Sequence, residues 1–507
     1  MSDNLGTNSA KEKVEIYLCI TSPVHIGTRE GKLTALDFVH LEGRTHIIKE
    51  DAFGRFLASK GDMVVDQFVR HVGSGSFIGM ADFLSKLQRL DFKKATREIS
   101  SSAINGGASN MKEFRPFIRD GANQVYIPGS SLKGVLRTTL LYQILANDPE
   151  AKKRIEQKAE DGLRKIRQDR RLRPFYSLKW LQESLLADYD MRGTDQAPHK
   201  DLLRCLSLRD AYPVGTVKTR IIPLQFLSKN GGGIFSWSGK RRRDRDAGGT
   251  LEIWVEAAVE GIFRVELLWD QNLLSKFREE NSHRSLPVAG CAEILNSAHN
   301  MNARLVEHEI DFLSHVAGGH EDAPVAAKAL HSWYKGLTGN LIRIGFGSGM
   351  LGTTVNHLFK EKLRQEIRDI CGDERPNAPA PKSRRIWRQA EAQWLPLGWL
   401  TVCQAGEKPA VILKDFVEPP KSIERAITPK PRQPLPPPVA PTSTDLLLHV
   451  KSINIQDKLT LDRFLSALEN LEDEEECRQI ARILSGRMKA ASIWQKHAFQ
   501  KRIEMLL

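Results

Sequence analysis

A proline-rich segment divides the 507-residue chain into two parts of very different length. Nine of the 24 prolines lie between Pro419 and Pro441, in the sequence PPKSIERAITPKPRQPLPPPVAP. Proline fixes φ and has no amide hydrogen, so this segment cannot join the interior of a helix or sheet. Its composition is typical of a semi-rigid linker. We therefore expect a linker over residues 419–444.

The part beyond this linker, residues 445–507, is predicted to be helical. Leucines recur there at the spacing of an amphipathic helix, at Leu461, Leu465, Leu468 and Leu471. The acidic run at 472–476 suits a helix start, where carboxylates interact favourably with the helix dipole. Ten basic and ten acidic residues cancel in this part, so the net charge of +13 belongs to residues 1–444. We expect a small all-α domain here, and a nucleic-acid site before the linker.

The front part alternates between strand-like and helical patterns. The strand-like stretches are residues 14–22, 44–50, 203–211, 219–227, 250–259 and 261–270. Residues 51–72 are a predicted helix capped by Asp51. Residues 285–336 are predicted helices with a stop at Gly318-Gly319, and Glu260-Gly261 resembles a hairpin break. This mixture predicts an α+β architecture of ferredoxin-like type.

Composition excludes several classes of protein. A hydrophobic fraction of 41% and a charged fraction of 27% fit an ordinary soluble protein. No apolar run approaches the roughly 18 residues that span a bilayer, and residues 1–13, an expected disordered tail, have no apolar secretory core. The six cysteines lie far apart without disulfide-framework or CxxC spacing. We expect reduced thiols, a cytoplasmic location and no membrane partner.

A helix start with two cations follows a strand in VYIPGSSLKGVLRTTLL, residues 125–141. Ser130 or Ser131 is the expected cap of the first free amides. Lys133 and Arg137 are four residues apart and share a face away from the apolar stripe. Free amides, hydroxyls and cations at a helix N-terminus can bind phosphate. The alternative is a well-capped helix whose basic residues are only solvated.

A glycine loop follows the strand-like segment LIRI. Gly347, Gly349 and Gly352 fit G-x-G-x-x-G, but a proline-rich loop replaces the acidic strand end that dinucleotide binding needs. Thr353 stands in place of the Walker A lysine, which argues against nucleotide hydrolysis. The loop amides can follow a phosphodiester backbone, with Thr353 and Thr354 at the next helix start. A tight turn between packed elements is an equally good interpretation.

A basic loop, residues 231–249, has glycines at both ends. Its cations are Lys240, Arg241, Arg242, Arg243 and Arg245. Phe235 and Trp237 stand beside them, so the loop offers phosphate pairing together with base stacking. We favour nucleic-acid contact over a merely solvated charge run.

The histidines give no catalytic or metal constellation. His25, in TSPVHIGTREG, has a side chain suited to acid–base chemistry on RNA, but the sequence shows no partner for it. We interpret it as a structural residue of its loop. The other candidates lack metal-ligand spacing, so neither a metal nor a cofactor is predicted; they are His299, His308, His315 and His320.

Five segments occur in an order that resembles the RAMP superfamily of CRISPR-associated proteins. They are SPVHIGTREG, IPGSSLKGVLRT, IGFGSGMLGTTV, PKSRRIW and WLPLGWLTV, within about residues 14–403. The chain is specifically similar to the Csm-type subunit at the crRNA 3′ end of type III-A effector complexes. This resemblance implies two ferredoxin-like (RRM-like) domains, for which we expect residues 14–247, with a helical insertion, and residues 248–418.

The resemblance also implies a function and partners. It implies a non-catalytic subunit that binds crRNA, caps the filament at the crRNA 3′ end and is needed for 3′-end maturation in antiviral defence. The partners would be the 3′ region of crRNA, target RNA, the Csm-type backbone subunits and host nucleases. The implied RNA-contacting positions are His25, Gly27, Ser130, Ser131, Lys133, Arg137, Gly345, Gly347, Ser348, Gly349, Arg384 and Arg385, and we add Lys240 to Arg243 from the basic loop. The C-terminal helical part is not covered by the resemblance.

Other functions remain open. In the RAMP paralogues that form the filament backbone, an aspartate on a loop after the same histidine–glycine element cleaves target RNA with a divalent metal. Asp37 lies at a comparable distance here, although LDFV is expected to begin a strand, which would make Asp37 structural. The alternatives are a RAMP ribonuclease that uses Asp37 or His25, a different RAMP subunit of a type III complex, and a sequence-independent RNA chaperone.

Overall fold

The protein is described here by a computed structural model that forms two compact units, residues 1–417 and 418–507. The described residues are 11–29, 31–73, 79–87, 90–169, 171–172, 179–193, 196–239, 251–319, 321–371, 377–404, 450, 458–469, 473–490 and 499–506. The expected linker at 419–444 and the cations of the basic loop lie outside them. The expected domain boundaries therefore stay predictions.

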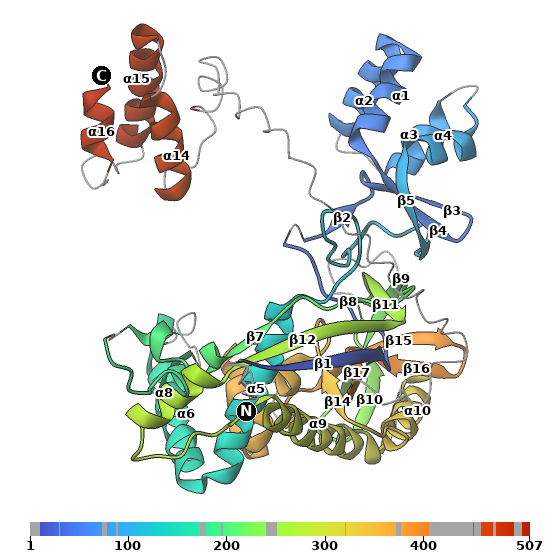
Figure 1. The fold of residues 1–507 in the computed structure, drawn as a ribbon. Helices are drawn as coiled ribbons and strands as arrows, with labels where there is room; N and C mark the ends of the chain where they lie inside the picture. The colour runs from blue at the N-terminus through green and yellow to red at the C-terminus, as the bar shows by residue number, and fades with distance from the viewer. Residues whose placement is uncertain are drawn as a thin grey trace, which may run out of the picture. The chain divides into compact units, whose positions relative to one another are not determined.

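Six strands of the described residues form an antiparallel sheet (Figure 1). Their order is β14 (Leu341–Arg343), β17 (Trp399–Gln404), β1 (Lys11–Ile20), β12 (Ile262–Asp270) and β7 (Leu206–Leu208), with β8 (Tyr212–Pro213) also paired to β12. The strand predicted at residues 14–22 is confirmed, but it begins at Lys11, inside the expected tail. Residues 203–211 are only partly a strand, because a 3-10 helix, η3 (Leu202–Cys205), precedes β7.

A second, nine-stranded sheet is organised around β9 (Lys218–Lys229). This strand pairs with β5 (Ser100–Gly106), β10 (Ile234–Trp237), β11 (Ile253–Glu260) and β15 (Ser383–Ala390). The outer strands are β3 (Phe38–Leu41), β4 (Arg44–Ile48), β13 (Gly318–Gly319) and β16 (Gln393–Pro396). A separate two-stranded sheet contains β2 (Leu33–Thr34) and β6 (Glu113–Phe114). The strands predicted at residues 44–50 and 219–227 are confirmed.

The hairpin expected at Glu260-Gly261 is wrong. β11 pairs with β9 in the nine-stranded sheet, whereas β12 pairs with β1 in the other sheet. The chain therefore passes from one sheet to the other at Gly261, whose φ is +134°. Strand adjacency along the chain suggested a local turn, but the partners of both strands are distant in sequence.

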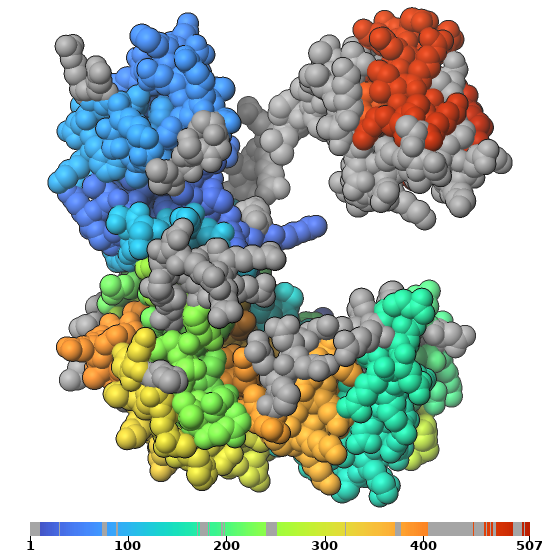
Figure 2. All heavy atoms as spheres, turned by 180° about the vertical axis from the view of Figure 1, so that it is seen from behind, coloured from blue at the N-terminus to red at the C-terminus, as the bar shows by residue number. Residues whose placement is uncertain are grey.

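Helices cover one face of the six-stranded sheet and enclose the largest core cluster. Along β1, Ile16, Leu18 and Ile20 belong to this cluster, while Cys19 belongs to a cluster on the opposite face, as the two-residue period of a strand requires. The contributing helices are α5 (Gly129–Asn147), α6 (Pro149–Gln168), α7 (Lys179–Leu186), α8 (Gln271–Glu280), α9 (Cys291–Ser314) and α12 (Glu361–Cys371). Figure 2 shows the orange α12 beside the teal α6, where Arg167 and Glu366 form a 3.2 Å ion pair. No helix of the described residues is both long and apolar enough to cross a bilayer.

A helical insertion lies between β4 and β5 in the sequence. The single helix predicted over residues 51–72 is two helices, α1 (Glu50–Lys60) and α2 (Asp62–Gly73), because Gly61 breaks it with φ +86°. Asp51 is in the first turn of α1 and Lys49 is the N-cap, so the predicted cap is wrong. The insertion continues with α3 (Met80–Lys86) and α4 (Phe92–Ile99), and its four helices share a hydrophobic cluster.

The described elements of the second unit are three helices, α14 (Lys458–Glu469), α15 (Glu474–Ala490) and α16 (Gln500–Met505). Leu461, Leu465 and Leu468 are buried, as their spacing predicts, while Leu471 lies outside the described residues. The acidic residues from Glu474 to Glu476 occupy the first turn of α15, as predicted.

Candidate nucleic-acid interface

Three loops that carry sequence motifs meet in the large unit. They are the loop after β1, the glycine loop after β14 and the turn before β17. The amide of Phe346 donates to the carbonyl of His25 at 2.8 Å. The amide of Gly398 donates to the carbonyl of Pro23, and its own carbonyl accepts from Ile344, both at 2.8 Å. Main-chain hydrogen bonds therefore fix the glycine loop between segments more than 300 residues apart.

Two glycines of this loop are required by close approach. A Cβ on Gly345, which has φ +79°, would lie 2.4 Å from the carbonyl oxygen of His25. A Cβ on Gly347, which has φ +106°, would lie 2.9 Å from Leu397. Gly349 also has positive φ, but its Cβ would enter open space. Gly345 and Gly347 thus serve packing, while Gly349 is exposed and Phe346 is half-buried.

The short helix α11 (Gly349–Thr353) follows the loop directly. The two threonines expected at its start lie at its end, where their hydroxyls donate back to the carbonyls of Gly349 and Met350. That prediction is wrong because the helix begins at Gly349. The 3-10 helix η5 (Asn356–Leu358) comes next.

A buried ion network lies beneath the glycine loop. Glu309 of α9 is 3.1 Å from Arg343 of β14 and also pairs with Arg384 of β15. Burial raises the pKa of the Glu309 carboxyl, but Arg384 and Arg343 outweigh burial and lower it overall, so this carboxylate is charged. Arg343 also donates to the carbonyls of Leu397 and Gly347. The network positions the glycine loop. It also pairs Arg384 with a buried carboxylate inside the protein.

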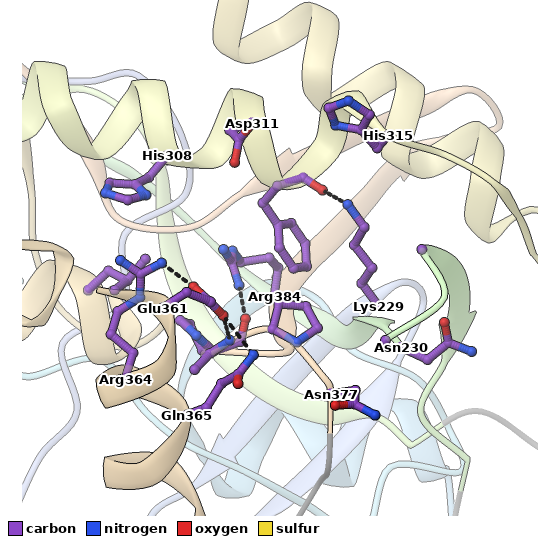
Figure 3. Close-up of a pocket in the computed structure, with 17 residues that line it drawn as sticks. Lys229, Asn230, His308, Asp311, His315, Glu361, Arg364, Gln365, Asn377 and Arg384 are labelled. Atoms are coloured by element: carbon purple, nitrogen blue, oxygen red, sulfur yellow. Dashed lines mark hydrogen bonds and ion pairs between the residues drawn. The ribbon is translucent and has the colours of Figure 1, made fainter. Parts of the chain in front are cut away.

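Two cavities adjoin this network. The smaller, of about 180 Å³, is lined by the glycine loop and by the arginine pair Arg384 and Arg385. The larger, of about 540 Å³, is also lined by Arg384, and Figure 3 shows Lys229 and Arg364 around it with His308 and Asp311 of α9 and His315 just after that helix. Its volume lies in the range of ligand pockets. The structure therefore brings the predicted residues of the glycine loop together with the predicted arginine pair.

Several charges in the larger cavity are balanced internally. Lys229 donates to the carbonyl of Phe312 at 2.7 Å, and burial lowers the pKa of its ammonium group. Arg364 pairs with Glu361, whose carboxylate also accepts the amide of Ala380 at 2.8 Å. The side chains of Lys229, Arg364 and Arg384 line the cavity together with Asp311 and Glu361, so its lining holds three basic and two acidic residues.

His25 lies under the glycine loop and its side chain is buried. The ring Nδ1 is 2.7 Å from the carbonyl oxygen of Glu256, and the rings of Phe117 and Phe346 pack edge-on against it. Burial lowers the pKa of His25 to about 4, so the ring is neutral at pH 7. An RNA contact through this side chain would require it to leave its site; only the main chain of His25 and of Gly27 remains a candidate.

The start of α5 forms a separate surface beside β7, at the opposite edge of the six-stranded sheet from β14. The predicted serine caps are wrong: Pro128 is the N-cap, and the amide of Gly129 donates to Asp210 at 2.7 Å. Lys133 donates to the carbonyl of Leu206 at 2.6 Å, and Arg137 pairs with Asp201 at 2.9 Å. Among the described residues, no hydrogen bond or ion pair joins Ser130, Ser131 or these cations to the glycine loop.

The two aromatic residues of the basic loop lie in different environments. Phe235 is fully buried in the second core cluster, and the indole of Trp237 donates to Asp322 at 2.8 Å. Both lie in β10, which packs near α10 (Ala323–Lys335). The predicted stacking role is therefore wrong for Phe235, which β10 turns into the core. Lys240, Arg241, Arg242 and Arg243 lie outside the described residues.

Asp37 has a local structural role. It lies in the turn between β2 and β3, where its carboxylate accepts from the amide and the hydroxyl of Thr34 at 2.7 and 2.8 Å. This agrees with the interpretation of Asp37 as structural. In the portion of the chain that the structure describes, no cluster of three His, Cys, Asp or Glu residues could hold a metal ion.

Sequence reasoning missed three residues of this interface: Glu309, Arg115 and Phe346. The guanidinium groups of Arg385 and Arg115 lie 4.4 and 5.4 Å from the ring of Phe346. An aromatic residue between Gly345 and Gly347 was a usable signal, since glycines have no side chains to keep other groups away from its ring. Glu309 and Arg115 carry no local signal, because their partners are distant in sequence.

Comparison with known proteins places the chain among CRISPR-associated proteins. A model of the RAMP superfamily matches residues 18–289, more than half of the chain. The CRISPR system Cms protein Csm5 of Enterococcus italicus is 27% identical over 154 residues, which cover 25% of this chain and 43% of that relative. The match thus spans less than half the length of this curated relative.

Two solved structures resemble the fold. A chain in the cryo-EM structure of a Csm-crRNA-target RNA ternary complex of a type III-A CRISPR-Cas system has a TM-score of 0.50 at 20% identity. The likeness covers 77% of this chain and 100% of that one. The crystal structure of T. onnurineus Csm5 has a TM-score of 0.47 at 19% identity, with 76% and 99% covered. At these identities the first likeness concerns the mixed α/β fold alone.

Proposed function

The chain belongs to the RAMP superfamily, and on that premise we propose that it is a crRNA-binding subunit of a type III-A Csm complex. In this proposal it caps the filament at the crRNA 3′ end, supports 3′-end maturation and is not itself catalytic. The observation that carries the proposal is the meeting of the glycine loop with the arginine pair around a cavity. Glycine-loop backbone and guanidinium groups are suited to binding a phosphodiester chain.

The partners follow from the relatives. The structural neighbour comes from a complex that contains crRNA and target RNA, and the curated relative is a Csm5 protein. We therefore include crRNA, target RNA and other Csm subunits as partners. That host nucleases trim the crRNA is a further part of the proposal, carried over from the family resemblance. We also retain two ferredoxin-like domains, residues 14–247 and 248–418, and a C-terminal all-α domain. The three described helices of the second unit support the C-terminal all-α domain.

The geometry favours a binding role over a ribonuclease that uses His25 or Asp37. A general acid or base must reach the proton that it transfers, but the His25 ring is buried and bonded to a main-chain carbonyl. The Asp37 carboxylate is bonded to Thr34. We therefore expect that Asp37→Ala leaves target-RNA cleavage by the assembled complex in place.

Sizing crRNA in purified complexes tests this function. Csm complexes assembled with and without this chain are compared for bound crRNA on denaturing gels. We expect longer, untrimmed 3′ ends, or loss of 3′-end protection, when the chain is absent. Unchanged crRNA length and occupancy would contradict the capping role. Metal-dependent cleavage of single-stranded RNA by the isolated chain would contradict the non-catalytic role.

A further inference from the structure

Two arginines lie close to one aromatic ring of the glycine loop. The ring of Phe346 is half-buried, with the Arg385 guanidinium 4.4 Å from its centroid and that of Arg115 5.4 Å away. The two charges therefore cannot be further apart than the sum of these distances. The negative face of an aromatic ring attracts cations, so Phe346 can hold two like charges near one another.

Among the described residues, these two cations differ from the neighbouring arginines in having no acidic partner. Arg343 and Arg384 pair with Glu309, and Arg119 pairs with Glu256. Within the described residues, neither Arg115 nor Arg385 forms an ion pair. The Nε atom of each is also buried without a hydrogen-bond partner there. A buried donor without an acceptor costs free energy.

Repulsion and burial act in the same direction at this place. The pKa of the Arg385 guanidinium is lowered first by burial and then by the charges of Arg115 and Arg343. A bound anion would relieve both effects. The cluster therefore carries uncompensated positive charge beside the loop that the proposed function assigns to RNA.

Both arginines stand on ordered main chain. The amide of Arg115 donates to the carbonyl of Trp254 at 3.0 Å, and its carbonyl accepts from Glu256 at 2.8 Å, which fixes it along β11. Arg385 is in β15, opposite Phe226 of β9. Such preorganisation lowers the cost of ordering these side chains when a ligand binds.

We propose that Arg115 and Arg385 together bind one backbone phosphate of RNA, with Phe346 as the positioning residue that holds both guanidinium groups. The proposal rests on the RNA-binding function above and extends it to Arg115 and Phe346. Guanidinium groups that lie against a ring keep N–H donors for phosphate oxygens, and planar forks suit that geometry better than an ammonium group.

Salt-dependent RNA binding by the full-length protein tests this proposal. A fluorescein-labelled 20-nucleotide single-stranded RNA is titrated by anisotropy between 50 and 300 mM KCl. The variants are Arg115→Ala, Arg385→Ala, the double variant and Phe346→Leu. Arg97→Ala is the matched control, because it removes one positive charge from an exposed residue of α4 that pairs with Glu42. Melting temperatures show whether each variant is folded.

We expect each arginine variant to weaken binding about tenfold, and the control to change it less than twofold. Because one phosphate is shared, the double variant should lose less than the product of the two single losses. Its logarithmic salt slope should fall by about 0.7, the value for one phosphate of a single strand. Phe346→Leu should weaken binding without changing the net charge. If Arg385→Ala unfolds the protein, Arg385→Lys replaces it and should still bind more weakly than wild type.

The outcomes separate the two proposals. Wild-type protein that binds no RNA would overturn the proposed function. Wild-type protein that binds RNA, with arginine variants that match Arg97→Ala, would overturn only the shared phosphate site. Fully multiplicative losses with a slope change of about 1.4 would indicate two separate phosphates and would also overturn the shared site.

Discussion

Glu309 and Arg343 form a 3.1 Å ion pair inside the protein, and each side chain is only 2% exposed. Arg384 completes the network from another strand. One carboxylate therefore connects α9, β14 and β15, and through Arg343 it also fixes the carbonyl of Gly347. Removing one member leaves buried charge without a partner, which is costly even where the intact network adds little net stability.

Replacing Glu309 should destabilise the large unit. We expect Glu309→Gln to lower the free energy of unfolding by about 3–5 kcal/mol, because two guanidinium groups lose their buried counter-charge. Glu307→Gln is the matched control on the same helix, since Glu307 is 61% exposed and its pair with Arg304 lies at the surface. Urea denaturation measures both variants. Equal effects would show that the buried network does not support the fold.

Buried neutral histidines predict a stability that falls in mild acid. Burial lowers the pKa of His25 and of His357 to about 4, whereas an unfolded histidine titrates near 6.5. Below about pH 6.5 the unfolded state binds protons that the folded state does not, so each histidine contributes a loss of about 1.4 kcal/mol per pH unit, down to its folded pKa. Denaturation between pH 7 and 5 measures the slope.

A single substitution tests the origin of this slope. His25→Gln should reduce the slope of unfolding free energy against pH, because one fewer proton is taken up on unfolding. His315→Gln, which replaces an exposed histidine, should leave this slope unchanged. A slope that is insensitive to His25→Gln would mean that this ring takes up a proton in the folded protein as readily as in the unfolded one.

The start of α5 requires a pair of variants to separate structure from RNA contact. From the sequence, Arg137 is a surface cation, but its 2.9 Å pair with the partly buried Asp201 gives it a structural role as well. We expect Arg137→Ala and Asp201→Asn to cost similar stability, about 1 kcal/mol. RNA affinity measured alongside should fall only in Arg137→Ala if Arg137 contacts RNA. A parallel loss in both variants would make the effect structural.

Gly345 and Gly349, at the two ends of the glycine loop, differ in how much room each leaves for a side chain. Alanine at Gly345 should be far more damaging than alanine at Gly349, although both have positive φ. Positive φ alone costs about 1–2 kcal/mol, and only at Gly345 does the new methyl group also meet the His25 carbonyl at 2.4 Å. Thermal unfolding checks the order, which similar midpoints would contradict.

Deleting residues 445–507 should leave RNA binding largely intact. The deleted part carries ten basic and ten acidic residues, so its removal leaves the net charge of the chain unchanged. We therefore expect an unchanged salt slope in a filter-binding assay, with affinity within about threefold of the full chain. A collapse of the slope would place phosphate contacts in the C-terminal helices.

The sequence predicted strands and loops well and their partners poorly. The stretches that form β1, β4 and β9 were identified from their β-branched and aromatic residues. Those residue types reflect the burial of each strand itself, which does not require knowing its partner. The supposed hairpin at Gly261 failed because both strands pair with distant segments. The burial of Phe235 was missed because the sequence pattern of an aromatic residue near arginines is the same in an exposed loop and in a strand that faces the core.

The candidate site shows the same division. Glycine spacing and the arginine pair were visible in the sequence, and the structure brings them together. That Arg384 pairs with Glu309 while Arg385 has no such partner depends on α9, 75 residues away. Adjacent residues of a strand point to opposite faces of the sheet, so Arg384 and Arg385 have different neighbours. The sequence around the two arginines does not show which face meets α9.

The pairing of β1 with β17 also determines when, during synthesis of the chain, the six-stranded sheet can form. Cys19 lies opposite Thr401, so β1 cannot pair with β17 until nearly the whole large unit has been synthesised. At about 5–20 residues per second, a ribosome needs on the order of 20–80 s to reach that point. During this interval one edge of β1 is without its partner, and unpaired strand edges invite aggregation. Nascent chains of this protein are therefore expected to depend on chaperones until residue 404 has emerged.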